Sequence, residues 1–129
     1  MTTAAPQHLR VLPGRYVIEH TADEHRALST PWLCLTRAPE GLTVVRETTT
    51  PKPPTDPDGT EYWAALYSGD TAHGLDVVGM LASLLTPLAA AGVPVFVAST
   101  RDADLILVPE DRLADTARAL RTAGHLVDL

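Results

Sequence analysis

The sequence contains only one cysteine, Cys34, and few basic side chains, with 10 Lys and Arg against 16 Asp and Glu in 129 residues. A single cysteine cannot form a disulfide within the chain, so a reducing, cytoplasmic setting is the simplest expectation. The net charge of −6 argues against a nucleic-acid partner, because phosphate binding needs clustered cations. Cys34 lies in an apolar stretch, which favours a core position over a nucleophilic role.

Long apolar runs are also missing. The most apolar segment, 75–98, is interrupted by an acid, two hydroxyl side chains and two prolines, which makes it a poor membrane span. The first ten residues, MTTAAPQHLR, lack the basic start and apolar stretch of a signal peptide. We therefore expect no membrane partner, and we expect residues 1–8 to form a loose tail.

Common enzyme signatures are absent. The sequence has no Gly-x-Ser-x-Gly elbow, phosphate-binding loop, dinucleotide fingerprint or zinc-protease helix motif. Residues 19–25, EHTADEH, hold two histidines and three acids without the spacing of a metal site, so a solvated loop is expected there. The sequence therefore indicates no catalytic residues, no metal and no cofactor.

The first half has the composition of a small β-sheet. Residues 15–20 form a strand-like stretch, and the apolar runs 32–38 and 42–47 are joined by Pro-Glu-Gly, which indicates a hairpin. Prolines are then dense between residues 49 and 60, which forbids regular ladder pairing and favours an extended connector.

The proline-rich stretch suggests the division of the chain. We predict a β-rich first half over 9–50, a linker over 51–60 and a complete domain over 61–129.

The second half alternates strands and helices. Val77, Leu81, Leu84 and Leu88 recur at helical spacing, and Pro87 removes one hydrogen bond from that helix. The predicted elements are a strand over 61–68, a helix over 77–91 capped by Asp76 and stopped by Gly92, strands over 93–99 and 105–109, a helix from Glu110 that ends at Gly124, and a closing strand over 125–129.

This βαββαβ order is typical of an α+β, ferredoxin-like sandwich, with two helices on one face of a four-stranded antiparallel sheet. A domain of this length is marginally stable alone. We therefore expect strands of the first half to dock onto it.

The same order places two polar segments side by side. The loop 99–104 is expected beside the helix start at 74–77, where unpaired N–H groups can hold a carboxylate. Asp102 and Asp104 can accept hydrogen bonds from an ammonium group, so this end of the sheet suits an amino acid. At the helix start, a turn at Gly74 with Asp76 as a cap is the favoured interpretation. For the loop, a solvated turn in which the Asp side chains bond to their own backbone explains the residues equally well.

Residues 79–125, with GMLASLLTPLAAAGVPVFVASTRDADLILVPEDR at their start, resemble ACT-domain proteins of the small bacterial group related to the CASTOR arginine sensors. The stretch WLCLTRAPEGLTVV (32–45) is similar to a segment of the same group. The likeness covers residues 11–129. It implies two ACT-like halves, the first degenerate, that bind an amino acid or similar ligand between ACT units without catalysis.

The resemblance also implies a ligand site. Gly74–Val78 match the family's strand-to-helix turn, and the loop acids and hydroxyls match its loop. Arg101 stands where the family has an aromatic residue, which favours an acidic ligand or a pair with Asp102. The site expected from the resemblance and the fold order comprises Gly74, Leu75, Asp76, Val77, Ser99, Thr100, Arg101, Asp102 and Asp104.

Three functions compete at this point. The first is a non-catalytic protein that binds or senses an amino acid or related metabolite. The second is a regulatory or oligomerisation module, such as a homodimer, with a vestigial pocket and no ligand. The third is RNA binding, since RRM domains share the βαββαβ order, but LILV (105–108) has no aromatic residue and the chain is acidic.

Overall fold

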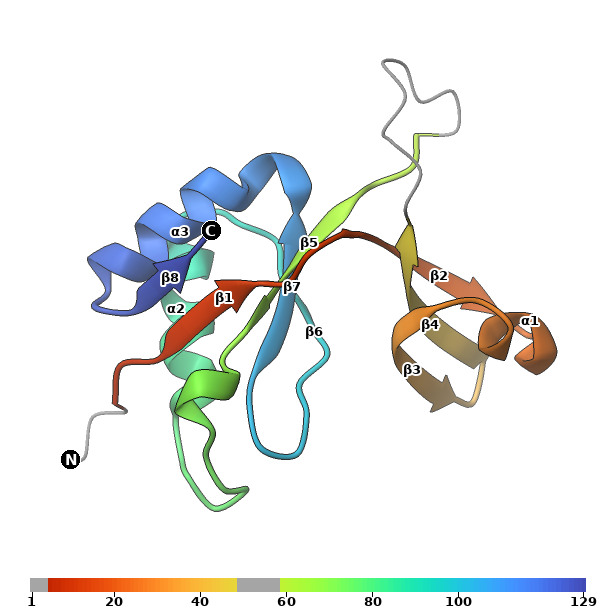
Figure 1. Cartoon of the computed structure of the whole chain (residues 1–129), viewed down its shortest axis with the longest axis horizontal. Helices are drawn as coiled ribbons and strands as arrows, with labels where there is room; N and C mark the ends of the chain where they lie inside the picture. The colour runs from red at the N-terminus through yellow and green to blue at the C-terminus, as the bar shows by residue number, and fades with distance from the viewer. Residues whose placement is uncertain (1–4, 49–58) are drawn as a thin grey trace. The chain divides into compact units, whose positions relative to one another are not determined.

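The computed structural model describes residues 5–48 and 59–129 (Figure 1). The chain divides into two compact units, each described separately below. The larger unit contains residues 5–13 and 64–129, and the smaller unit contains the described residues between 14 and 63. The linker predicted over 51–60 lies outside the described residues except for its last two positions. Within the described residues, no helix is long and apolar enough to cross a membrane.

The larger unit has the α+β architecture that the sequence predicts, and its second half has the expected order of elements. It consists of β1 (His8–Val11), β5 (Trp63–Tyr67), the 3-10 turn η1 (Gly69–Thr71), α2 (Met80–Ala90), β6 (Phe96–Val97), β7 (Leu105–Pro109), the 3-10 turn η2 (Glu110–Arg112), α3 (Leu113–Thr122) and β8 (Leu126–Asp128). The first residue of β5, Trp63, belongs to the smaller unit. The strand predicted over 93–99 is shorter than expected.

The sheet of this unit has a fifth strand that the sequence analysis did not predict. Its order is β8-β1-β5-β7-β6, so β1 lies between the first and last strands of the βαββαβ unit. β1 runs antiparallel to β5 and parallel to β8, with Leu9 opposite Val127. The start of the chain thus completes the sheet, which fits the expectation that outside strands stabilise this short domain.

Both helices of the larger unit share one hydrophobic core with the sheet. Leu84 and Leu88 of α2, together with Leu120 of α3, are fully buried. They pack in one cluster with apolar side chains from β1, β5, β7 and β8. Burying a leucine side chain contributes roughly 1.5–3 kcal/mol, so this cluster is the main source of stability for the unit.

The first helix of the unit, α2, begins later than predicted. It starts at Met80, and Gly79 before it has a φ of 85°, a left-handed conformation that a right-handed helix cannot include. Asp76 therefore does not cap the helix, and residues 74–77 belong to the preceding loop. The end is as predicted, with Gly92 at a φ of 71° just after the C-cap.

Pro87 removes a helix hydrogen bond, and a histidine from outside the helix replaces it. The Ser83 carbonyl lies four residues before Pro87, which has no N–H to donate. His125 Nε2 lies 3.0 Å from that carbonyl, while its Nδ1 accepts a hydrogen bond from the Gln7 backbone N–H at 2.9 Å. Because Nδ1 accepts, Nε2 carries the proton and donates to Ser83.

The smaller unit is a three-stranded antiparallel sheet with one short helix. It consists of β2 (Arg15–Thr21), α1 (Glu24–Leu28), β3 (Trp32–Ala38) and β4 (Gly41–Thr48), in the strand order β3-β4-β2. The predicted strand 15–20 and the hairpin are confirmed, and Gly41 takes the positive φ of 132° that the tight turn needs. Cys34 is half-buried on β3 rather than in the core.

Two features of this unit involve residues outside the hairpin. The segment 19–25, expected as a solvated loop, instead holds the end of β2 and the start of α1. Asp23 caps this helix by accepting from the Arg26 N–H at 3.1 Å. Tyr16 of β2 pairs with Trp63 and is 4% exposed. Burial, and secondarily the negative charge of Glu47, raises the pKa of the Tyr16 hydroxyl.

Candidate ligand site

The end of β5 and the start of β7 are joined by hydrogen bonds between Ser68 and Asp104. The Ser68 N–H donates to the Asp104 carbonyl at 3.0 Å, and the Asp104 N–H donates to Ser68 Oγ at 2.8 Å. Both residues are buried, at 0% and 4% exposure. Asp104 is therefore fixed by the sheet itself, although it belongs to the polar loop between β6 and β7.

Most polar groups of the loop 99–104 bond within the loop or its edge. The Thr100 N–H donates to the Ala103 carbonyl at 3.0 Å, and Thr100 Oγ1 accepts from the Ala103 N–H at 3.2 Å. Ser99 Oγ accepts from the Leu105 N–H at 3.2 Å. The Thr100 N–H is thus already used, so it does not hold a ligand carboxylate in this conformation.

Arg101 and Asp102 form an ion pair on the surface. Arg101 Nη1 lies 2.9 Å from Asp102 Oδ1, and both side chains are mostly exposed. Of the two roles considered for Arg101, the structure contains the pair with Asp102. An exposed pair of this kind contributes little to stability, about 0–1 kcal/mol.

The loop between η1 and α2 contacts the 99–104 loop through its backbone. The His73 N–H donates to the Asp102 carbonyl at 2.6 Å. A Cβ at Gly74 would lie 2.7 Å from Asp76 Oδ1, so the Asp76 carboxylate folds back over Gly74. Leu75 and Val77 point outward, with exposures of 77% and 46%. The structure therefore brings the two predicted segments together at the backbone level.

The Asp104 carboxylate faces two side chains that the sequence analysis left out of the site. Gln7 Nε2 donates to Asp104 Oδ2 at 3.1 Å and to the Met80 carbonyl at 2.8 Å. His73 Nε2 lies 3.6 Å from the same carboxylate oxygen. Gln7 is 1% exposed, so the expectation of a loose tail over 1–8 is wrong at residues 7 and 8, and residues 1–4 lie outside the described residues.

Several polar atoms of this group have no hydrogen-bond partner among the described residues. They include Gln7 Oε1 and His73 Nε2, both fully buried. Both Gln7 Nε2 hydrogens are used by acceptors, which fixes the orientation of its amide and leaves Oε1 as the acceptor without a donor.

The hydrogen bond of His73 to the Gly74 carbonyl indicates which of its ring nitrogens carries a proton. His73 Nδ1 lies 3.2 Å from the Gly74 carbonyl, so Nδ1 carries a proton. In the neutral ring, Nε2 is then an acceptor that faces the carboxylate of Asp104, itself an acceptor. A donor beside this pair, within hydrogen-bond distance of each atom, would satisfy both. Gln7, which carries the unpartnered amide oxygen, bonds to the same carboxylate. The arrangement suits a group with several N–H donors.

The start of α2 lies next to this group. Gln7 bonds to the carbonyl of Met80, the first residue of α2, and no side chain caps this helix end. The N–H groups of a first helical turn lack partners within the helix and carry partial positive charge. An acceptor-rich carboxylate site and a donor-rich helix start are thus linked by a single side chain.

The predicted site is therefore partly assembled. The His73 backbone bonds to the Asp102 carbonyl, its side chain faces Asp104, and Gly74 follows it in the chain, so these predicted residues lie close together. Ser99, Thr100 and Arg101 bond within their own loop. The residues that sequence reasoning missed, Gln7 and His73, carried no local signal, because an isolated glutamine and a scattered histidine form no motif. The described residues contain no cluster of His, Cys, Asp or Glu that could hold a metal ion.

Comparison with known proteins finds a family model that matches part of the chain. Residues 59–122 match the model of the ACT domain. The α+β, ferredoxin-like fold of the larger unit is the fold of ACT domains. ACT domains are generally regulatory modules that bind small ligands.

Solved structures share the fold over most of the chain. A protein of unknown function from Vibrio cholerae, described as a possible transport protein, has a TM-score of 0.71 and 23% identity, covering 87% of this chain and 85% of its own. A structural-genomics protein from Agrobacterium tumefaciens has a TM-score of 0.71 and 27% identity, covering 96% and 93%.

An enzyme also contains a similar structure. Aspartate kinase from Clostridium acetobutylicum, described as an allosteric enzyme, has a TM-score of 0.60 and 11% identity. The match covers 89% of this chain but 33% of the kinase. At this identity the likeness concerns the fold alone.

Proposed function

We propose that this protein is a cytoplasmic, non-catalytic regulatory protein that binds an amino acid or a related metabolite at the end of the ACT sheet. The ligand ammonium would bind at Asp104, beside Gln7 and His73. The ligand carboxylate would bind at the loop 74–79 and the uncapped first turn of α2, rather than at Thr100. We also propose that the protein is related to the bacterial ACT-domain group that resembles the CASTOR arginine sensors.

The observation that supports this proposal is the buried carboxylate of Asp104 among unsatisfied polar atoms. A buried polar group without a hydrogen-bond partner lowers the stability of the folded state by about 1–3 kcal/mol, and native proteins contain few such groups. An ammonium group offers three N–H donors. Gln7 Oε1 and His73 Nε2 each lack one, so the ligand would relieve both of these costs while the Asp104 carboxylate balances its charge.

A thermal-shift screen against the twenty amino acids tests the proposal. A ligand present at 100 times its Kd stabilises the folded state by about 2.7 kcal/mol, which raises the Tm by on the order of 10 °C. Asp104→Asn keeps the shape and the backbone bonds to Ser68 but removes the charge, so it should abolish the shift. Asp102→Asn, at the exposed position two residues earlier, is the matched control and should retain it.

Two outcomes contradict the proposal. One is that no amino acid or close analogue raises the Tm. The other is that Asp104→Asn shifts as much as Asp102→Asn, which would place the ligand elsewhere.

A specific observation supports the alternative of an oligomerisation module with a vestigial pocket. Leu75, Val77 and Val78 are 77%, 46% and 87% exposed on one short loop, and an apolar loop of this kind suits contact with another protein surface. Under this alternative, light scattering shows a homodimer that is the same with and without amino acids. Leu75→Ser with Val78→Ser would then yield a monomer.

A further inference from the structure

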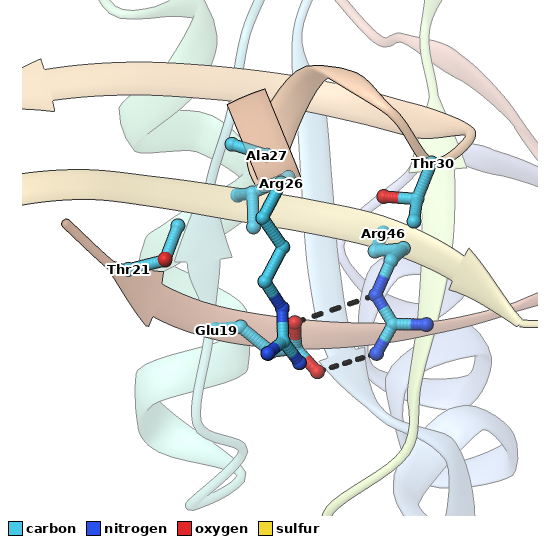
Figure 2. Close-up of a pocket in the computed structure, with 7 residues that line it drawn as sticks. Glu19, Thr21, Arg26, Ala27, Thr30 and Arg46 are labelled. Carbon is cyan, nitrogen blue, oxygen red and sulfur yellow. Dashed lines mark hydrogen bonds and ion pairs between the residues drawn. The ribbon is translucent and has the colours of Figure 1, made fainter. Parts of the chain in front are cut away.

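The smaller unit contains a pocket between α1 and its sheet, and the strand register determines one wall of it. Glu19 of β2 lies directly opposite Val44 of β4, and Thr21 lies two residues along on the same face. Arg46 is two residues beyond Val44, within diagonal reach of Glu19. The pocket, with a volume of about 170 Å³, is lined by these four residues on the sheet side (Figure 2).

The other wall comes from α1 and the residues that follow it. Arg26, Ala27 and Thr30 line the pocket there. Ala27 is 2% exposed and, like Val44, contributes apolar surface to the lining, while Figure 2 shows the Arg26 side chain pointing toward Glu19. The small side chain of Ala27 leaves the space that a longer residue would fill.

The charges in this pocket do not cancel. Arg46 donates to Glu19 through two nitrogens, with Nε 3.3 Å from Oε2, and this pair is half-buried. Arg26 forms no ion pair with any described residue through its guanidinium group, so the lining carries one positive charge in excess. A guanidinium presents a planar fork of donors that matches a carboxylate. In a chain with a net charge of −6, this is a local site for an anion.

We propose that this pocket binds a small organic monocarboxylate with a hydroxyl or keto oxygen next to the carboxylate. The carboxylate would bind Arg26 and the free donors of Arg46, and its single charge would balance the excess. Thr21 and Thr30 supply hydroxyls for the neighbouring oxygen. A cavity of 150 Å³ accommodates benzene, so about six non-hydrogen atoms fit a pocket of this size. The site is separate from the one proposed in the larger unit and does not depend on it.

A titration of the ¹⁵N-labelled full chain with pyruvate, followed by NMR, tests this site. Sodium chloride holds the ionic strength constant. For six atoms with one charged contact, we expect saturable shifts of amides in 19–30 and 44–46 with a Kd on the order of 1 mM. Arg26→Gln should weaken binding by about tenfold, since it removes one charge-assisted bidentate contact.

Arg37→Gln is the matched control. It removes the same charge from the smaller unit, at an exposed pair with Glu24 outside the pocket, and should leave the Kd unchanged. Arg26 is exposed, so its replacement should preserve the fold; if the spectrum shows unfolding, Thr30→Val replaces it and should weaken pyruvate binding several-fold. Linear, non-saturating shifts, equal losses in Arg26→Gln and Arg37→Gln, or equally tight binding of inorganic phosphate would overturn the proposal.

Discussion

Replacing Gln7 by alanine tests whether the start of the chain is part of the core of the larger unit. The backbone bonds of this residue, to His125 and from Leu126, remain in the variant. Only the side-chain amide is lost, together with its bonds to Asp104 and to the Met80 carbonyl. The substitution therefore isolates the contribution of one buried side chain.

The expected loss of stability follows from these contacts. A hydrogen bond to a charged group contributes about 1.5–3 kcal/mol and a neutral one about 1 kcal/mol. The Met80 carbonyl also accepts from Ser83 Oγ, which lessens the second loss. Freeing a buried glutamine side chain returns about 1.5 kcal/mol of conformational entropy. The net cost is about 2 kcal/mol, which lowers the Tm of a domain of this size by about 10 °C.

Urea and thermal unfolding, followed by circular dichroism, measure this cost. Arg10→Ala, at an exposed position of β1, is the control and should change stability by less than about 0.5 kcal/mol. Combining Gln7→Ala with Asp104→Asn in a double-mutant cycle should give a coupling of at least about 1 kcal/mol. If Gln7→Ala costs no more than the control, or if the two changes are additive, the buried contact does not exist in solution.

Three further predictions concern other parts of the chain. Because the pKa of Tyr16 is raised in the folded state, the folded protein binds more protons than the unfolded chain above about pH 10. The free energy of unfolding should therefore fall as pH rises through that range, and it should fall less in Tyr16→Phe. Urea unfolding at each pH measures this difference. His125→Ala leaves the Ser83 carbonyl without a donor and should lower the free energy of unfolding by about 1–3 kcal/mol. Adding Pro87→Ala restores the helix N–H and should recover part of this loss. If nothing is recovered, His125 does not replace the hydrogen bond that Pro87 removes. Gly41→Ala forces a residue with a Cβ to a φ of 132° and should lower the Tm, whereas an unchanged Tm would mean that the turn relaxes.

The elements that could be predicted are those with local patterns. The hairpin between β3 and β4 has a short turn that ends in glycine between two apolar runs, and β7 is a continuous apolar run before an acidic helix start. The start of α2 was predicted three residues too early. The apolar spacing extends back to Val77, but the left-handed backbone conformation of Gly79 prevents the helix from including the residues before Met80. Helix α1 was missed, since its five residues are too short for a periodic signal.

From the sequence alone we could predict the βαββαβ order, the resemblance to ACT domains and the position of Asp104 in the loop that follows β6. Those features depend on neighbours within one element or one turn, where side-chain type and spacing carry the information. The three-dimensional fold was needed to show that β1 completes the sheet and that Gln7, 97 residues from Asp104, bonds to its carboxylate. The fold was also needed to show that Arg26 and Arg46 line one pocket. Contacts between distant residues arise when packed elements meet, and no local pattern in the chain records which side chains will face each other there.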